Sequence, residues 1–416
     1  MLQTISPDLL PFITTVINGS LTSGHVSTAF KKARVIPILK KPALDPSDIS
    51  NYRPNNLHDP NQSGFKAAHS TETALLAVTE KLHAARSAKL SSVLILLDLS
   101  AAFDTVNHKT LLSTLRSLGI CGTAWEWFAS YLDGRSYQVT WKGLTSAPRR
   151  HSTGVPQSSV LLFSLYTHSL GKVISSHGFS YHCYADDTQL IFSFPPSDTT
   201  TSARISACLA DISSWMTAHQ LKLNPSKTEL LIIPGDPSPA QDLAISLSNS
   251  MISPTASALN LGVTMDNQLS FSSHVTNVTR SCRFLLYNIR RIRPFLSTQA
   301  TQVLVQSLVI SRLDYCNSLL AGLPLNAIRP LQMIQNAAAR LVFNLPKFSH
   351  TTPLLRSLHW LPVAARIRFK TLMLAYKAKN GPAPSYLKAL ITSRTAPRLL
   401  RSTSTARLVP PSLREK

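Results

Sequence analysis

Two adjacent carboxylates, Asp186 and Asp187, interrupt an otherwise apolar stretch of this 416-residue chain. The residues on either side, 179–184 and 188–192, are rich in aromatic and β-branched side chains, which favour strands. The pattern therefore predicts a β-hairpin with the acidic pair at its turn. An ordinary turn remains an alternative, because aspartate tolerates turn conformations and hydrogen-bonds to its own backbone.

A second apolar run also ends in a carboxylate. Residues 93–97 contain no polar side chain, which is typical of a strand buried on both faces of a sheet, and Asp98 follows them. A buried carboxylate is costly unless something positive meets it. Two such strands can bring Asp98, Asp186 and Asp187 together as a hard-oxygen site suited to Mg²⁺. Two Mg²⁺ ions can stabilise the attacking and leaving oxygens of a phosphoryl displacement.

Five motifs follow one another in a fixed order, and together they are more specific than any one of them. The motifs are DLSAAFDTVNH (98–108), GVPQSSVLLFSLY (154–166), YADDTQLIF (184–192), LKLNPSKTELLII (221–233) and LNLGVTMDNQLSF (259–271). The ordered set resembles the reverse transcriptases of non-LTR retrotransposons (long interspersed elements). The resemblance runs from about residue 10 to near the C-terminus. It implies an α+β right-hand polymerase with an antiparallel palm sheet plus helices, reduced fingers and a helical thumb.

The resemblance also implies a reaction and a set of catalytic residues. An RNA template and a DNA primer would bind, and the primer would be extended from dNTPs. Asp98 and Asp186 would hold Mg²⁺ with the Leu99 carbonyl as a further ligand, and Asp187 would support them. Lys227 matches the lysine that protonates the departing pyrophosphate, a task suited to its tunable pKa. A surface lysine before a strand explains Lys227 equally well.

Four residues match positions that contact the incoming nucleotide in this family: Lys41, Arg53, Phe103 and Gln157. Lysine and arginine both suit phosphate, yet a lysine-rich strand edge that prevents aggregation is nearly as good an explanation of the first two. Phe103 would exclude a ribose 2′-hydroxyl, and a core phenylalanine is the alternative. Gln157 offers both a donor and an acceptor to the nascent pair.

Other matched positions would contact the template and primer. Gly154 allows close backbone approach to nucleic acid, and Leu261 and Gly262 resemble a primer-gripping turn. The remaining members of this set are Tyr184, Arg280, Arg283, Arg290 and Arg291.

Charge is distributed very unevenly along the chain. Residues 1–270 contain 20 Lys and Arg against 18 Asp and Glu, whereas residues 271–416 contain 22 against 2. A basic C-terminal lobe of this kind indicates a polyanionic partner. Because arginines alternate with apolar helical faces there, we prefer nucleic acid to a membrane surface.

We expect five regions. They are an N-terminal extension (1–29), reduced fingers (30–90), the palm (91–257), a primer-grip turn with thumb and basic helical extension (258–391), and a disordered tail (392–416). Apolar periodicity predicts helices near residues 70–82, 111–118, 125–132, 205–216, 271–291, 299–320, 326–343 and 361–379.

The chain departs from the family pattern in three places. No endonuclease-like domain precedes the motifs, and only residues 55–61 join the Tyr-Arg-Pro motif to Gln62 and its neighbours. After Gln157, Ser158 replaces a glycine and a Gly-Pro-Leu step is missing. A three-residue loss rotates a helix by about 300°, which should misplace the helix beneath the acidic strands. The alternative function is therefore that of a catalytically dead protein, derived from a retrotransposon, that binds nucleic acid. A third alternative, a metal-dependent nuclease, would leave the other motifs unexplained.

The remaining composition limits the compartment and the class of protein. Five scattered cysteines without a Cys-x-x-Cys pair favour free thiols in a reducing compartment over a zinc site or disulfide scaffold. No apolar run reaches the roughly 18 residues of a membrane span, and no signal peptide is recognisable at the N-terminus. We expect a nuclear or cytoplasmic protein that is not secreted. The sequence does not indicate an oligomeric state.

Overall fold

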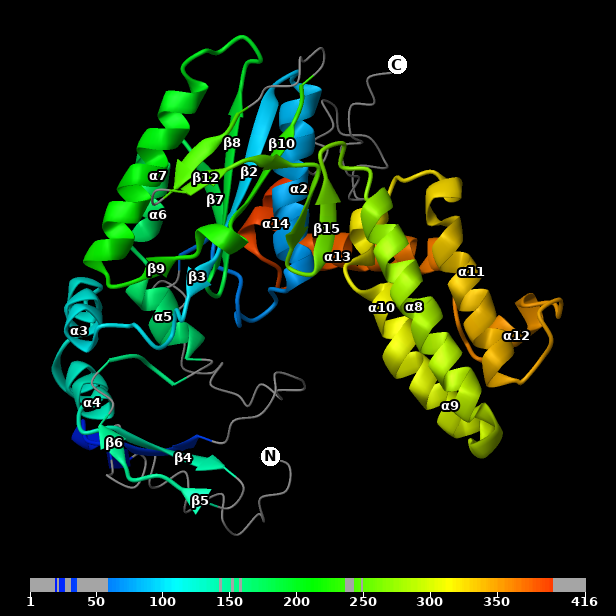
Figure 1. Cartoon of the computed structure of the whole chain (residues 1–416), viewed down its shortest axis with the longest axis horizontal. Helices are drawn as coiled ribbons and strands as arrows, with labels where there is room; N and C mark the ends of the chain where they lie inside the picture. The colour runs from blue at the N-terminus through cyan, green and yellow to red at the C-terminus, as the bar shows by residue number, and fades with distance from the viewer. Residues whose placement is uncertain are drawn as a thin grey trace, which may run out of the picture.

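The computed structural model describes residues 19–20, 22–26, 31–35, 59–141, 144–150, 153–156, 159–235, 243–247 and 250–391. A five-stranded sheet in the order β13-β10-β2-β8-β7 forms its centre (Figure 1). β2 runs antiparallel to both of its neighbours, β10 and β8. Both the predicted hairpin and the predicted central strand are therefore confirmed. The strands are β2 (Ser91–Leu97), β7 (Ser180–Tyr184), β8 (Asp187–Phe194), β10 (Glu229–Ile233) and β13 (Pro254–Thr255).

Strand β2 is buried on both faces, as its continuous apolar run predicts. Successive side chains of a strand point to opposite faces. Val93, Ile95 and Leu97 belong to one hydrophobic cluster, whereas Leu94 belongs to a second. The sheet therefore lies between two cores, and β2 contributes to both.

Helices cover each face of the sheet (Figure 1). On one face, α2 (Thr71–Ser87) packs against β2, β7 and β8. Ser70 caps this helix in a capping box with Thr73. On the other face lie the remaining palm helices: α3 (His108–Ser117), α5 (Val160–Tyr166), α6 (Leu170–Ser176) and α7 (Thr201–Ala218).

Helix α5 corrects an expectation about the altered Gly-Val-Pro-Gln motif. We expected the missing residues to misplace this helix. Instead, Phe163 and Tyr166 are 1% and 0% exposed and form part of the palm core. The Tyr166 hydroxyl also donates a hydrogen bond to the His219 carbonyl at the end of α7. The helix thus keeps a full set of apolar contacts despite the shortened motif.

Short ladders surround the main sheet. β3 (Leu99–Ser100) pairs with β9 (Lys222–Leu223), and β11 (Ile245–Leu247) pairs with β12 (Ser250–Ile252). A separate small sheet joins β1 (Lys32–Val35), in parallel, to β4 (Ser136–Trp141). Strand β4 follows α4 (Gly122–Leu132) in the chain, and it also pairs with β5 (Leu144–Thr145) and β6 (Arg149–Arg150).

The C-terminal third is helical, as predicted. A hairpin of β14 (Ser257–Asn260) and β15 (Val263–Asp266) leads into it. The long helix expected at residues 299–320 is divided, because a π-helical turn, Gln306–Ile310, separates two α-helical segments. The helices are α8 (Ser272–Ile292), α9 (Thr298–Val305), α10 (Ser311–Asp314), α11 (Leu325–Val342), α12 (Thr352–Ser357), α13 (Val363–Asn380) and α14 (Ser385–Leu390).

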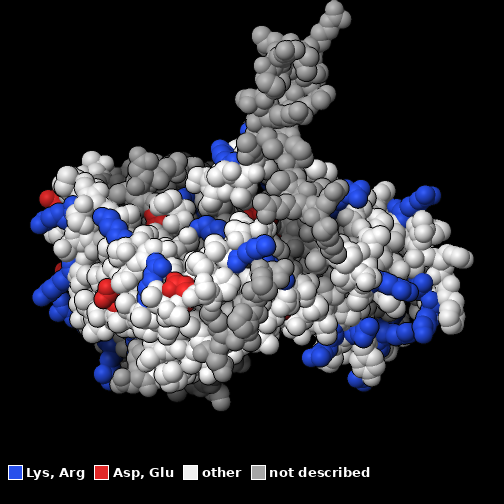
Figure 2. All heavy atoms as spheres, turned by 90° about the horizontal axis from the view of Figure 1, so that it is seen from above, with Lys and Arg blue, Asp and Glu red and all other residues white. Residues whose placement is uncertain are grey.

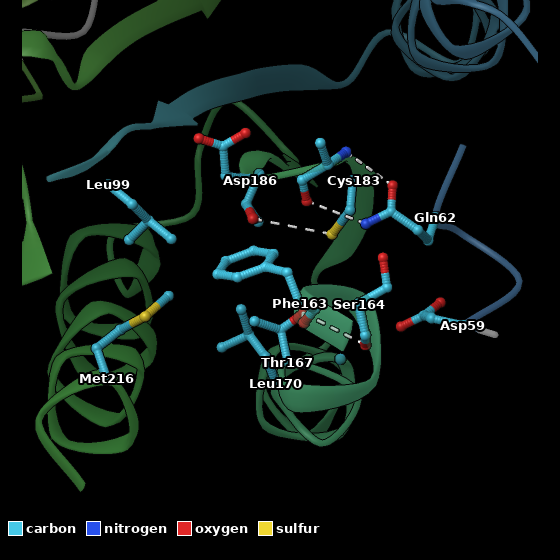
Figure 3. A pocket seen from close by; sticks show the side chains of 13 residues that line it. Asp59, Gln62, Leu99, Phe163, Ser164, Thr167, Leu170, Cys183, Asp186 and Met216 are labelled. Atoms are coloured by element: carbon cyan, nitrogen blue, oxygen red, sulfur yellow. Dashed lines mark hydrogen bonds between the residues drawn. The ribbon is translucent and has the colours of Figure 1, made fainter. Parts of the chain in front are cut away.

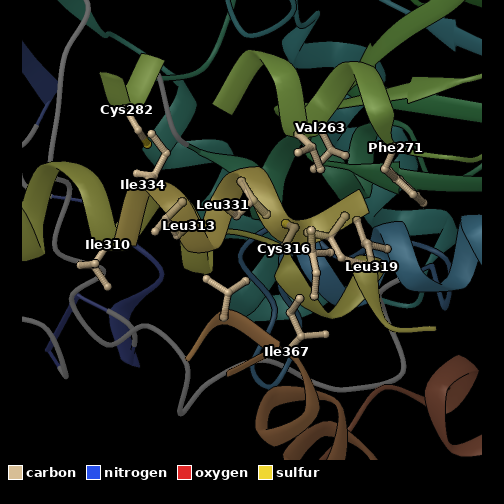
Figure 4. Packing of buried hydrophobic residues seen from close by; sticks show 14 of the residues in the cluster. Val263, Phe271, Cys282, Ile310, Leu313, Cys316, Leu319, Leu331, Ile334 and Ile367 are labelled. Atoms are coloured by element: carbon tan, nitrogen blue, oxygen red, sulfur yellow. The ribbon is translucent and has the colours of Figure 1, made fainter. Parts of the chain in front are cut away.

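One hydrophobic cluster joins the sheet to these C-terminal helices. It contains Leu75 of α2, Leu94 of β2 and Leu331 of α11. Figure 4 shows the C-terminal part of this cluster, where side chains such as Leu313 and Ile367 converge between the helices. The thumb is therefore packed against the palm through shared core residues rather than tethered by a linker.

All five cysteines are free thiols, as predicted. Within the described ranges, no helix combines the length and apolarity needed to cross a bilayer.

The dual role of β2 predicts a large cost for truncating its buried side chains. Leu94 is 0% exposed, so Leu94→Ala should destabilise the protein by about 3 kcal/mol through lost burial and a cavity. Leu144 is 80% exposed, so Leu144→Ala should change the stability by less than about 0.5 kcal/mol. Urea unfolding followed by circular dichroism measures both, and equal effects would contradict the central placement of β2.

Candidate active site

The hairpin of β7 and β8 closes in a two-residue loop. Tyr184 pairs with Asp187, so Ala185 and Asp186 form the loop itself. Ala185 has a φ of 57°. Two-residue hairpin loops favour positive φ because it matches the twist of the strands, although it costs a non-glycine residue about 1 kcal/mol. We call residues 184–187 the acidic turn.

The register of the neighbouring strand brings a third carboxylate to the acidic turn. Leu97 of β2 lies opposite Thr188 of β8. Because the two strands are antiparallel, the next residue, Asp98, comes level with Asp187. The structure thus places Asp98, Asp186 and Asp187 at one edge of the sheet, as the sequence predicted.

A loop after β9 holds Asp98 in place. The Asn224 side chain donates from Nδ2 to Asp98 Oδ2 at 3.0 Å, and its backbone N–H donates to the Asp98 carbonyl at 2.9 Å. Lys227 follows in a short 3-10 turn, with its Nζ 3.9 Å from Asp98 Oδ2. The Lys227 side chain is 68% exposed, so its ammonium can reach outward from the site.

The three carboxylates influence one another's charge. The pKa of Asp187 is raised to about 6 by partial burial of its carboxyl group and then by repulsion from Asp186 and Asp98. Part of the Asp187 residue still reaches solvent. The carboxylates therefore lie close enough for each to disfavour ionisation of the others.

Oxygen donors of this kind fit a divalent cation. In the described part of the chain, no group of three or more His, Cys, Asp or Glu side chains is arranged closely enough to hold a metal ion by itself. Mg²⁺ does not need such a group, because it is usually bound by one or two carboxylates together with substrate phosphates. The mutual repulsion at Asp187 is the property that a bound cation would relieve.

A cavity opens beside the acidic turn (Figure 3). Asp186, Leu99 and Phe163 are among the residues that line it. Phe103 packs on Phe163 with ring centroids 5.2 Å apart, and it is half-buried. Phe103 therefore contacts a residue that lines the cavity, and this residue, Phe163, also belongs to the core.

Gly154 lies where only a glycine fits. Its φ is 86°, and a Cβ there would approach the Asp104 carbonyl oxygen to 2.7 Å. Its N–H donates to the Val106 carbonyl at 2.7 Å, and the next N–H donates to the Phe103 carbonyl at 2.8 Å. The Gly-Val-Pro segment is thus fixed against the loop that follows β3.

Leu261 and Gly262 form the predicted turn. They are the two loop residues of the β14–β15 hairpin, because Asn260 pairs with Val263, and both have positive φ. The Tyr315 hydroxyl donates to the Leu261 carbonyl at 2.6 Å. A residue from the thumb therefore fixes the shape of this turn.

The four predicted thumb arginines share one face of α8. Arg280, Arg283, Arg290 and Arg291 are all exposed, and their spacing of three, seven and one residues keeps them on one side of the helix. The opposite side buries Val275, Cys282 and Ile289 among other residues. Arg283 and Arg290 also line a groove between α8 and α11.

Figure 2 shows one face of the molecule, on which Lys and Arg are visible over both the palm and the thumb, whereas the visible Asp and Glu lie over the palm end. In residues 271–391, the described part of the basic region, Asp314 is the one acidic residue, and it is paired with Arg366.

Three predicted residues, Lys41, Arg53 and Gln157, lie outside the described residues. The structure also reveals contacts that the sequence did not indicate, namely those of Gln62, Asn224 and Tyr315. Asn224 lies in the Asn-Pro-Ser-Lys motif that contains Lys227, so proximity in the motif is the one signal that could have pointed to it. Tyr184 lies at the end of β7 and is half-buried, and burial raises the pKa of its hydroxyl.

The chain is similar to polymerases of mobile elements. The "Probable RNA-directed DNA polymerase from transposon BS" of Drosophila melanogaster is 27% identical over 321 residues, which cover 74% of this chain and 35% of that protein. The "RNA-directed DNA polymerase from mobile element jockey" of the same species is 26% identical, with coverages of 66% and 33%. The chain thus spans about a third of the length of these relatives.

Two further proteins align with parts of this chain. The X-element polymerase of Drosophila melanogaster is 25% identical over 86% of this chain and 42% of its own length. Among solved structures, apo telomerase from Candida tropicalis aligns with 75% of this chain at 13% identity and a TM-score of 0.35, over 56% of its own length.

The family model described as "Reverse transcriptase (RNA-dependent DNA polymerase)" matches residues 33–289. This match covers more than half of the chain and includes the acidic turn, Asp98 and Lys227. Together with the mobile-element relatives, it confirms the predicted non-LTR type and the α+β polymerase fold class. The chain belongs to the reverse transcriptase (RNA-dependent DNA polymerase) family.

Proposed function

We propose that this chain extends a DNA primer by copying an RNA template, as a reverse transcriptase of the non-LTR retrotransposon type. The primer 3′-hydroxyl attacks the α-phosphate of a dNTP, and pyrophosphate leaves. The observation that carries this proposal is the meeting of Asp98, Asp186 and Asp187 at one edge of the palm sheet. Positioning and charge neutralisation provide most of the catalysis in reactions of this class.

Divalent metal dependence is general in this family, and we infer that Mg²⁺ is the ion used here. Asp98, Asp186 and the Leu99 carbonyl would hold it, with Asp187 in support. When bound, Mg²⁺ would stabilise the negative charge of the attacking and leaving oxygens. The raised pKa of Asp187 supports this assignment, because it comes from burial and from repulsion by Asp186 and Asp98, and a bound cation would offset both effects.

Lys227 is suited to the leaving group. Its exposed side chain begins beside Asp98, so its ammonium can remain near the site while it contacts pyrophosphate. A lysine in that position can give a proton to the departing oxygen. Phe103, whose ring contacts the cavity-lining Phe163, would limit the space at the sugar of the incoming nucleotide.

The thumb would hold the template and primer through their phosphates. Exposed arginines lie on one face of α8. When such arginines neutralise phosphates, the counterions condensed on the nucleic acid are released, which favours binding without sequence preference. The turn of Leu261 and Gly262 lies at the junction of palm and thumb, where it would contact the primer strand.

A binding protein without polymerase activity is the other function we considered. The packed α5 and the retained carboxylates favour the polymerase, because a relic would have no reason to keep three mutually repelling acids together. The two functions differ in one measurement, the extension of a primer on an RNA template.

The first prediction concerns the essential carboxylate. Asp186→Ala should abolish primer extension on an RNA template with Mg²⁺ and dNTPs, a loss of at least about 1,000-fold. Folding and RNA binding should remain close to those of the parent protein. Asp133 is 77% exposed and distant in the fold, so Asp133→Ala serves as the matched control with full activity. Extension by Asp186→Ala near the parent rate would contradict the proposal.

The second prediction concerns the charge of Asp187 in metal-free protein. Its pKa is raised from 3.8 to about 6, so the folded state binds this proton more tightly than the unfolded state. The contribution of this group to stability is therefore present below about pH 4 and is lost as the pH rises to about 6. Asp187→Asn should raise the thermal unfolding midpoint at pH 7.5, with chelator present, and much less at pH 4.

Magnesium provides the control for that experiment. Mg²⁺ at pH 7.5 should raise the unfolding midpoint of the parent protein, since it relieves the same repulsion. It should raise the midpoint of Asp187→Asn less. If the substitution lowers the midpoint equally at both pH values, the negative charge of Asp187 does not destabilise the metal-free protein.

The third prediction concerns the thumb. Arg283→Ala combined with Arg290→Ala should weaken template–primer binding and reduce the slope of log affinity against log salt by about 2. Arg204 is exposed on the palm helix α7, so Arg204→Ala is the matched control and should leave the slope unchanged. Fluorescence anisotropy over a salt series measures all three proteins, and an unchanged slope in the double variant would exclude this face of α8 as the phosphate contact.

A further inference from the structure

A short segment before α2 extends the palm sheet. Gln62 forms a parallel bridge with Cys183 of β7, which is the edge strand. The Ser63 N–H donates to the Cys183 carbonyl, and the Cys183 N–H donates to the Asn61 carbonyl, both at 2.9 Å. Residues 61–63 therefore lie along β7 up to the acidic turn.

The Gln62 side chain then contacts the backbone of the acidic turn. Its Oε1 accepts a hydrogen bond from the Ala185 N–H at 2.9 Å, and its Nε2 donates to the Ala185 carbonyl at 3.0 Å. Figure 3 shows the Gln62 amide facing this backbone. One amide group thus binds the peptide units on both sides of Ala185, the second of which leads directly to Asp186.

Three features show that this contact is specific. Gln62 is 3% exposed, and its Oε1 also accepts from the Gly64 N–H at 2.8 Å. Gly64 itself lies so close that a Cβ would overlap the Ala185 nitrogen. The acidic turn therefore requires two things of this segment. Position 62 must supply both a donor and an acceptor, and position 64 must have no Cβ.

Residues 61–63, which we call the supporting segment, are held in place by further side-chain contacts. The Ser63 hydroxyl lies 2.8 Å from His182 Nε2 and 2.8 Å from the Tyr386 hydroxyl of α14. Tyr386 also contacts Thr73 Oγ1 at 3.1 Å. Residues from the N-terminal part of the chain and from the last described helix thus meet beneath the acidic turn.

The acidic turn has two reasons to move without this support. Ala185 adopts a positive φ that is unfavourable for alanine, and the carboxylates beside it repel one another. We propose that Gln62 is a positioning residue: its amide fixes the Ala185 peptide so that Asp186 meets the metal ions in the polymerase reaction. The catalytic part of this proposal rests on the proposed function, whereas the structural part does not.

Gln62→Met, which keeps the length of the side chain and removes its hydrogen bonds with Ala185 and Gly64, tests the proposal. Hydrogen exchange of metal-free protein should become faster at residues 184–187 and remain unchanged in β2 and α8. In primer extension, kcat should fall by about 10- to 100-fold, because small displacements of a reacting group are costly. The KM for dNTP and the Kd for template–primer should change less than about 2-fold, since only the position of Asp186 is altered.

Gln189 offers a matched control in the same hairpin. It is 1% exposed, and among the residues that the structure describes, none hydrogen-bonds to its side-chain amide. Gln189→Met should leave exchange of residues 184–187 and kcat unchanged. Gly64→Ala, which displaces the supporting segment while retaining Gln62, should accelerate exchange as Gln62→Met does.

The two readouts separate failure of this proposal from failure of the proposed function. Unchanged exchange at residues 184–187 in Gln62→Met would overturn the positioning role. Faster exchange with unaltered kcat would overturn its catalytic consequence. If the parent protein itself extends no primer, the proposed function fails, and the exchange data still decide whether Gln62 holds the acidic turn.

Discussion

The register between β2 and β8 is the constraint on which both the fold and the site depend. In this register Leu97 lies opposite Thr188. Leu94 then packs in one core, and its neighbours Val93 and Ile95 pack in the other. A slip by one residue would exchange these side chains between the two cores. The same slip would remove Asp98 from its position level with Asp187. Apolar packing therefore determines where the carboxylates meet, although the carboxylates themselves repel one another.

The features that the sequence predicted well are those that local pattern decides. The hairpin follows from apolar strands around two aspartates, and β2 follows from a continuous apolar run. Order along the chain and family resemblance then identified Lys227 and the Leu261–Gly262 turn, which the structure places as expected. The misplacement of α5 was predicted wrongly, because a count of missing residues ignores how strongly Phe163 and Tyr166 favour burial.

The features that the sequence did not reveal are contacts between distant segments. Gln62 reaches Ala185 across 123 positions, and buried Glu72 of α2 pairs with Lys370 of α13 at 2.8 Å. Glu72 also accepts hydrogen bonds from the N–H and hydroxyl of Ser318. A buried charge needs such partners, but nothing in the local sequence says which residues they are. The contacts of Glu72 connect α2, which packs on the palm sheet, to the thumb.

The palm site and the thumb surface concentrate charges of opposite sign. The palm brings together three carboxylates that repel one another, and the thumb presents exposed arginines, while Asp314, the acidic residue in its described part, is paired with Arg366. Surface charges separated by more than about 10 Å are largely screened at 0.1 M salt, so the two excesses cannot neutralise each other across the molecule. Divalent cations with nucleotide phosphates would neutralise the palm, and the nucleic-acid backbone would neutralise the thumb. A template–primer with its metal ions supplies both at once, and the shared core of palm and thumb keeps the two charged surfaces in the relative position that such a ligand requires.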